Sequence, residues 1–147
     1  MIELHLKNLR DINEEIKQID EKIIEIRERI TSPKNQIISD MPKGNGTTEN
    51  ALDNALTKIK RLEERKAVLK DSLVLEWHIC RETFKSFHLT IQQIELVKYR
   101  YYYGLSWKHC TLLMKKKYPN EIWNENKVFR LHRQFISNCT KNSSKVC

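Results

Sequence analysis

Apolar residues recur along the first thirty positions at intervals of three and four residues in turn, and nearly everything between them is charged or an amide. Such a seven-residue repeat is typical of a helix that presents one narrow apolar stripe to a partner helix. We therefore expect a helix over about residues 4–31. The seam of this helix comprises Leu9, Ile12, Ile16, Ile19, Ile23, Ile26 and Ile30.

Residues 32–48 collect prolines, glycines and small polar residues, which predicts a long loop. Pro33 ends the first helix, because proline has no backbone N–H and disfavours a helical conformation in the residue before it. The loop is not purely polar, and we expect it to dock on the helices. The apolar residues that suggest docking are Ile37, Ile38 and Met41.

A second helix is predicted from about Glu49 into the eighties, because leucines, an alanine and an isoleucine continue the heptad frame, with Lys66 interrupting it. Its stripe can pair with the first to form an antiparallel hairpin, or both can associate with a homodimer mate or another coiled-coil partner. Around Trp77, Cys80 and Phe84 the apolar surface widens, which predicts a transition to a globular part. We place the domain boundary between 1–85 and 86–147.

Three short helices are predicted after residue 89. An apolar run ends at Gly104, where a left-handed helix C-cap favours glycine. Ser106 is a natural N-cap for the next helix, which ends before Pro119, and Asn124 can cap a last helix over 125 to about 137. Short helices separated by a glycine turn and a polar turn favour a helix-turn-helix. The predicted fold class is all-α, a long helical hairpin or coiled coil followed by a small helix-turn-helix domain.

The net charge of +8 is concentrated at one end: residues 89–147 carry eleven Lys and Arg against three Asp and Glu. A compact basic segment is the usual electrostatic footprint of a phosphate-binding surface. A merely solvated basic helix at the end of a bundle is the alternative interpretation of the same pattern.

Helical periodicity gives the last helix two distinct faces, and the apolar face carries Val128, Leu131 and Phe135. Arginine, asparagine and glutamine can make paired hydrogen bonds with guanine or adenine edges, whereas lysine suits phosphate. We therefore predict a DNA-binding surface with two sets of residues. The candidates on or beside the opposite face of the last helix are Asn126, Lys127, Arg130, Arg133 and Gln134. The candidate phosphate contacts on the preceding helix are Lys108, Lys115, Lys116 and Lys117.

Several function classes are disfavoured. The sequence has no glycine-rich phosphate loop, no nucleophile elbow and no metalloprotease motif, so we expect neither an enzyme nor a cofactor. The four cysteines have no metal-ligand spacing, and no metal site is expected. Free thiols, no leader segment and no long apolar run predict a cytoplasmic protein away from the membrane.

The stretch from Leu89-Thr90 through Tyr99-Arg100-Tyr101-Tyr102-Tyr103-Gly104-Leu105-Ser106-Trp107 resembles the glycine-turn core of region 4 of sigma-70-type factors. Ser39-Asp40-Met41-Pro42-Lys43-Gly44 after a coiled-coil helix, and Val128-Phe129-Arg130-Leu131-His132, resemble segments of the phage late-gene transcription regulators of Gram-positive hosts, the RinA/ArpU/LtrC-like group. One departure is the long connection from Met114 to Asn124, where sigma-like domains have a tight turn.

That resemblance implies a regulator, expected to be an activator of late or packaging genes, that binds promoter double-stranded DNA and acts with host RNA polymerase in the bacterial cytoplasm. Recognition positions carried over from it are Asn126, Lys127, Arg130 and Arg133. Two other functions fit the same layout. One is a DNA-packaging protein similar to a small terminase subunit, and the other is an interaction protein that captures a related transcription regulator.

Overall fold

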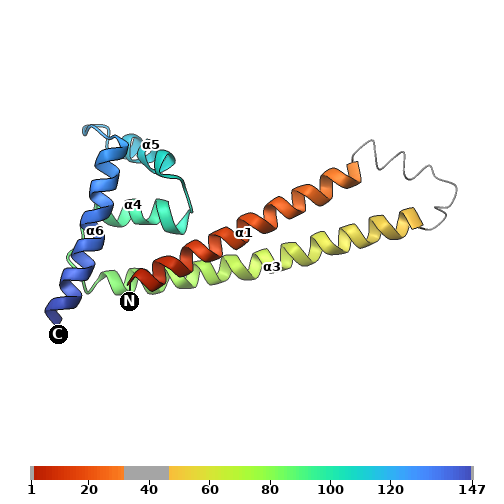
Figure 1. Cartoon of the computed structure of the whole chain (residues 1–147), viewed down its shortest axis with the longest axis horizontal. Helices are drawn as coiled ribbons and strands as arrows, with labels where there is room; N and C mark the ends of the chain where they lie inside the picture. The colour runs from red at the N-terminus through yellow and green to blue at the C-terminus, as the bar shows by residue number, and fades with distance from the viewer. Residues whose placement is uncertain (1, 32–46, 147) are drawn as a thin grey trace. The chain divides into compact units, whose positions relative to one another are not determined.

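The structure is a computed structural model that describes residues 2–31 and 47–146, with side chains described over 2–31 and 50–140. Every regular element in these residues is helical, as the sequence predicts (Figure 1). In chain order the elements are α1 (Ile2–Thr31), α3 (Thr47–Phe84), α4 (Ile91–Val97), the π-helix η2 (Lys98–Tyr102), α5 (Trp107–Lys117) and α6 (Glu125–Val146). The predicted docking of Ile37, Ile38 and Met41, and the Ser39–Gly44 segment of the resemblance, lie outside the described residues.

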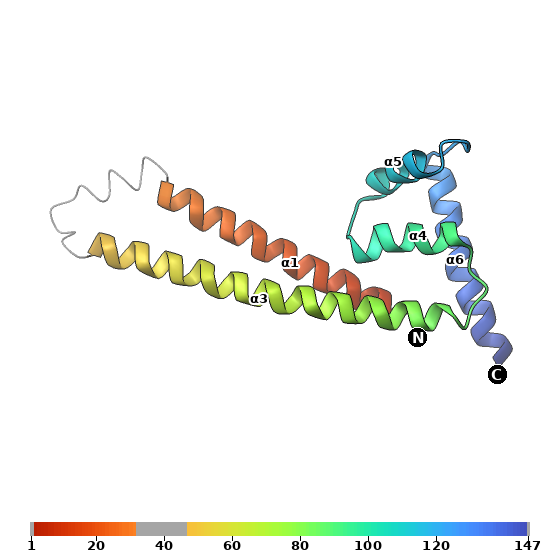
Figure 2. The ribbon, with the colours of Figure 1, turned by 180° about the vertical axis from the view of Figure 1, so that it is seen from behind.

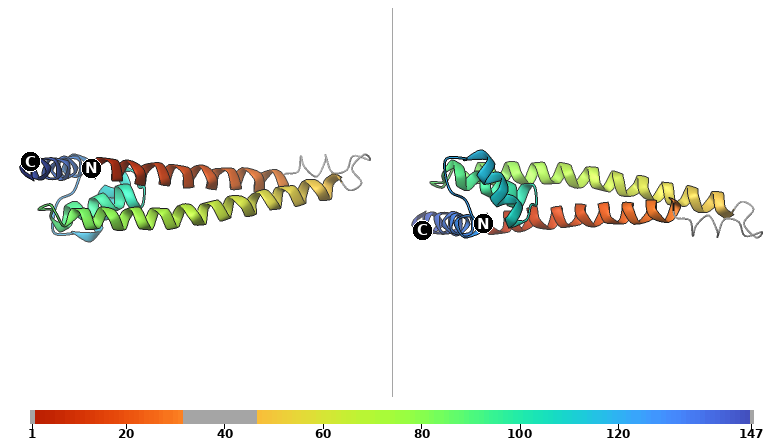
Figure 3. Two further views of the ribbon diagram at one scale, coloured as in Figure 1. Left: turned by 90° about the horizontal axis from the view of Figure 1, so that it is seen from below. Right: turned by 90° about the horizontal axis from the view of Figure 1, so that it is seen from above.

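Helices α1 and α3 lie side by side and antiparallel in every view, so the hairpin forms within one chain (Figures 1 and 3). Of the seven predicted seam residues, Leu9, Ile19, Ile23 and Ile26 are buried. The other three, Ile12, Ile16 and Ile30, are partly exposed because the stripe is narrow. The buried stripe also extends toward the N-terminus to Ile2 and Leu6, which the heptad analysis did not include.

Packing divides the chain into two compact units, Glu14–Asp71 and the combination of Met1–Asn13 with Ser72–Cys147. In the Glu14–Asp71 unit, Ile59 and Leu69 are buried on α3, and ion pairs join the two helices. Lys66, which interrupts the heptad, is paired with Asp20 at 2.5 Å. Two further pairs cross the hairpin, Arg65 with Glu15 at 3.1 Å and Arg27 with Glu63 at 3.0 Å. Lys66 therefore helps to set the register of the antiparallel pair α1 and α3.

In the other unit, the end of α3 carries the widened apolar surface that the sequence predicts. Trp77, Cys80 and Phe84 are buried, whereas the neighbouring Ile79 is 37% exposed. The Phe84 ring packs edge-on against Phe135 of α6, with centroids 5.6 Å apart. Burial raises the pKa of the Cys80 thiol to about 12, so this cysteine is a core residue rather than a reactive group. The boundary between 85 and 86 stays a prediction, although packing joins α3 residues to the helices that follow.

Helices α4, α5 and α6 surround a second group of buried side chains, and Figure 2 shows α4 and α5 beside α6. The centre of this group consists of Leu96, Cys110, Met114, Trp123 and Val128. The capping residues are as predicted: the Ser106 hydroxyl accepts a hydrogen bond from the His109 backbone N–H at 3.2 Å, and the Asn124 side-chain oxygen accepts one from the Lys127 backbone N–H at 2.8 Å. Helices α5 and α6 thus begin where local sequence signals place them.

One predicted boundary was wrong. Helix α6 does not end near residue 137 but extends to Val146. Cys139 is buried one turn beyond Phe135, so the apolar stripe continues past the predicted end. No proline or glycine occurs between Glu125 and Val146 to stop the helix.

Candidate nucleic-acid interface

Helix α6 has one buried face and one exposed face. Val128, Phe135 and Cys139 are buried, and Leu131 is half-buried. This face packs against α4 and α5. The side chains of Asn126, Arg130, Arg133 and Gln134 are exposed, and we call these four residues the α6 outer face. The predicted separation of packing and polar residues is therefore present in the structure.

Helix α5 places the basic residues of the second set at its exposed positions and at its last turn. Its buried residues are Cys110, Thr111 and Met114. Lys108, Lys115 and Lys116 are exposed. None of these three lysines has an acidic partner among the described side chains. They are the lysines of α5 that remain available to an anionic ligand.

Lys117 is engaged within the protein instead. Its ammonium lies 2.7 Å from the Glu95 carboxylate of α4. The hydrogen bond to Glu95 raises the pKa of Lys117. Burial alone would raise the pKa of Glu95, but the hydrogen bond and charge of Lys117 lower it below its usual range. This pair joins α5 to α4, and in the free protein it engages the Lys117 ammonium with Glu95.

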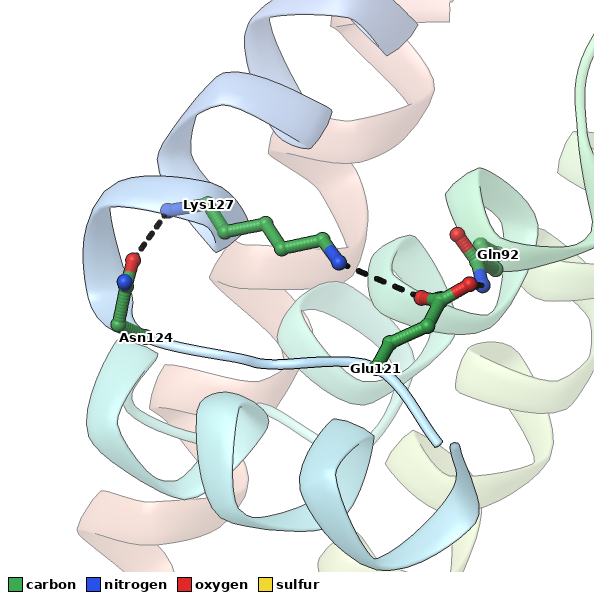
Figure 4. Close-up of polar contacts among 4 residues, drawn as sticks. All are labelled: Gln92, Glu121, Asn124 and Lys127. Atoms are coloured by element: carbon green, nitrogen blue, oxygen red, sulfur yellow. Dashed lines mark hydrogen bonds and ion pairs between the residues drawn. The ribbon is translucent and has the colours of Figure 1, made fainter. Parts of the chain in front are cut away.

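Lys127 is also engaged, at the start of α6 (Figure 4). Its ammonium lies 3.3 Å from a Glu121 carboxylate oxygen and 4.2 Å from the centroid of the Trp123 ring. Gln92 of α4 donates to both oxygens of the same carboxylate, at 3.0 and 3.2 Å. These contacts connect α4, the connection before α6 and the first turn of α6. Lys127 is therefore half-buried, unlike the α6 outer face.

The long connection between α5 and α6 is anchored in the core. Trp123 is only 3% exposed and belongs to the buried group between the helices. Tyr118 packs beside it, with ring centroids 6.0 Å apart. The Glu121 backbone N–H donates to the Tyr118 carbonyl at 3.2 Å, which closes a turn. Anchoring of this kind fixes the start of α6, although the connection is longer than a tight turn.

The glycine turn before α5 is held by a residue distant in the sequence. Gly104 has a φ of +66°, the left-handed conformation that the sequence predicts. The Asn13 side-chain amide of α1 donates to the carbonyl of Tyr101 at 2.6 Å and to that of Tyr102 at 3.2 Å. These carbonyls belong to the end of η2, where the helix leaves oxygens unpaired. The role of Asn13 could not be predicted from the sequence, because no local pattern links it to residue 104.

Arg100 is basic, but its guanidinium is engaged within the protein. Its guanidinium donates to the Leu105 carbonyl at 2.8 Å and lies 4.6 Å from the centroid of the Trp107 ring. His132 on α6 packs edge-on against the same Trp107 ring at 4.9 Å. The glycine turn, α5 and α6 thus meet at this group of rings. Arg100 and His132 have positioning roles here.

Four further observations describe what chemistry the described residues offer. Over the residues that the structure describes, no three His, Cys, Asp or Glu side chains gather as a metal site would require. Within the same residues, no helix is both long enough and apolar enough to cross a membrane. The described cysteines, Cys80, Cys110 and Cys139, are buried and unpaired. Exposed cations are what the surface offers: Lys108, Lys115, Lys116, Arg130 and Arg133.

Comparisons with known proteins identify no family for this chain. No protein-family model matches the chain, and neither a curated protein nor a solved structure matches it significantly.

Proposed function

We propose that this protein binds double-stranded DNA through the α6 outer face and acts as a transcription regulator without enzymatic activity. The observation that carries the proposal is the division of α6 into two faces. Its buried face packs against α4 and α5, and its exposed face carries Asn126, Arg130, Arg133 and Gln134. Asparagine, arginine and glutamine are residue types that can read base edges in the major groove, which is wide enough for a helix.

The lysines of α5 support the same proposal in a different role. Lys108, Lys115 and Lys116 are exposed without acidic partners in the described side chains. Lysines that contact phosphates fix the position of a protein on the duplex without reading its sequence. Base contacts and phosphate contacts would then come from α6 and α5, respectively.

Promoter DNA is the ligand that this function needs, together with host RNA polymerase, a homodimer mate or another coiled-coil partner. A single helix-turn-helix gives modest affinity, so such a protein acts as a dimer or beside the polymerase. The α1 seam packs within its own chain, with Ile19, Ile23 and Ile26 buried. A dimer built on that seam would have to open the hairpin, so we expect another surface to serve the partner.

A duplex-binding titration tests the proposed surface. The test variant is R130A/R133A, and the matched control is K58A/R61A, which removes the same charge from exposed positions of α3. We expect the test variant to lose about 1–3 kcal/mol of binding free energy for each base contact removed. The control should change binding only slightly. Equal effects of the two variants would mean that general charge, and not the α6 outer face, governs binding.

A further inference from the structure

The start of α6 contains a half-buried lysine whose ammonium is paired within the protein. Lys127 lies one position after Asn126 of the α6 outer face, but its ammonium is paired with Glu121 at 3.3 Å. The same ammonium lies over the Trp123 ring, 4.2 Å from its centroid. Figure 4 shows the chain of contacts from Lys127 through Glu121 to Gln92. A cation at this place would otherwise be well situated to meet a phosphate.

Glu121 is fixed independently of the lysine. Gln92 of α4 donates to both carboxylate oxygens of Glu121. The backbone N–H of Glu121 donates to the Tyr118 carbonyl. Trp123, two residues further on, is buried in the core. The carboxylate is therefore positioned by α4 and by the connection, and Lys127 comes to it from α6.

We propose that Glu121 lowers the sequence-independent DNA affinity of this surface by withholding the Lys127 ammonium from phosphate. This inference rests on the proposed function. Sequence-independent affinity depends on the number of cations that reach phosphates. A lysine that must leave a carboxylate first contributes less, whereas base contacts from Arg130 and Arg133 are unaffected. A phosphate contact contributes to specific and random complexes alike, so binding of a random-sequence duplex reports it directly.

The chain offers a matched control for Glu121. Glu125 is an exposed acidic residue in the first turn of α6. Glu121→Gln and Glu125→Gln remove one negative charge each from the same end of the helix. Glu121→Gln also preserves the size of the side chain and an oxygen that can accept from Gln92. The two variants therefore differ in whether Lys127 loses its ionic partner.

The experiment measures binding of a short random-sequence duplex over a range of salt concentrations, for wild type, E121Q, E125Q, K127A and E121Q/K127A. We expect E121Q to bind about two- to fivefold more tightly than wild type, as the loss of an exposed ion pair allows. Its salt dependence should steepen by about one phosphate contact. E125Q should gain less and keep the wild-type salt dependence. K127A should resemble wild type, and E121Q/K127A should lose the gain.

Thermal unfolding of each variant establishes that it is folded, and residue 121 is exposed, so a polar replacement is tolerated. Equal tightening in E121Q and E125Q would overturn the inference and leave the proposed function standing, because charge alone would explain it. The same holds if E121Q/K127A keeps the full gain. Absence of any duplex binding by the wild type at low salt would overturn the proposed function, and with it this inference.

Discussion

The Tyr101 hydroxyl and the Nε2 of His132 lie 2.8 Å apart and share a hydrogen bond, and their rings stack with centroids separated by 5.8 Å. Tyr101 belongs to η2 and His132 to α6, so this contact joins the segment before the glycine turn to the proposed DNA-binding helix. Burial lowers the pKa of His132, and the charge of Arg100 lowers it further. The folded protein therefore favours the neutral form of this imidazole more than the unfolded chain does.

This relationship predicts a loss of stability in weak acid. A histidine whose pKa is lower in the folded state binds fewer protons there than in the unfolded chain, so its contribution is full above the unfolded pKa of about 6.5. That contribution is lost as the pH falls through the lower folded pKa. We expect the melting temperature to drop between neutral pH and pH 5, and His132→Gln to flatten that decline. His109→Gln, which makes the same replacement at an exposed histidine of α5, is the control.

Neighbouring isoleucines of α1 provide a test of the hairpin. Ile23 is 5% exposed and Ile24 is 54% exposed. Ile23→Ala should cost about 2–5 kcal/mol of unfolding free energy, because it removes buried methyl groups and leaves a cavity. Ile24→Ala should stay within about 0.5 kcal/mol of wild type. Urea denaturation measures both, and similar losses from the two substitutions would contradict the observed packing.

The amide of Asn13 should be needed for the glycine turn. Asn13→Asp replaces the donor to the Tyr101 and Tyr102 carbonyls with a carboxylate that cannot donate. We expect a loss of about 1–3 kcal/mol, since the two carbonyls lose their partner and face a negative charge. Gln18→Glu makes the same chemical change at an exposed position of α1 and should have little effect. A wild-type denaturation curve for Asn13→Asp would show that the turn holds without this contact.

The lysines at the end of α5 should separate into two kinds. Neutralising the exposed Lys115 and Lys116 should weaken binding to every duplex and reduce the salt dependence by about two phosphate contacts. Lys117→Ala should chiefly lower stability, because it leaves Glu95 without its ionic partner. Parallel titrations and melting curves distinguish the two effects. If Lys117→Ala flattened the salt dependence as much as a change at Lys115, the Glu95 pair would not restrain Lys117 on DNA.

Elements governed by neighbouring residues could be predicted from the sequence. The caps at Ser106 and Asn124 and the left-handed Gly104 depend on short-range hydrogen bonding and on backbone sterics. The heptad likewise predicts the buried Ile19 and Ile23, because helical periodicity alone places them on one stripe. The predicted end of α6 was wrong: serine and asparagine near residue 138 have low helix propensity, yet the helix continues and buries Cys139.

The state of the candidate site was harder to predict. Net charge counts Lys117 and Lys127 with the other cations, yet tertiary contacts pair them with Glu95 and Glu121. No sequence spacing indicates these pairs. Lys117 and Glu95 lie on different helices, and Glu121 lies in the connection before the helix that carries Lys127. The burial of Trp123 was not predicted, although a tryptophan in a polar connection is a signal that could have indicated it. The residues of the α6 outer face could be predicted, because the periodicity of one helix is sufficient.

The contact of Asn13 with residues 88 and 89 positions further along the chain has a consequence for the order of folding. Contacts between distant residues form slowly, because the intervening chain must first lose conformational entropy. The intervening Glu14–Asp71 segment forms its own compact unit, so its helices can pair before the rest of the chain is ordered. Pairing of this segment joins the residues after Asn13 to those before Ser72, which shortens the effective loop. We therefore expect hairpin formation to precede closure of the glycine turn, and hydrogen-exchange protection to appear earlier in α1 and α3 than in η2.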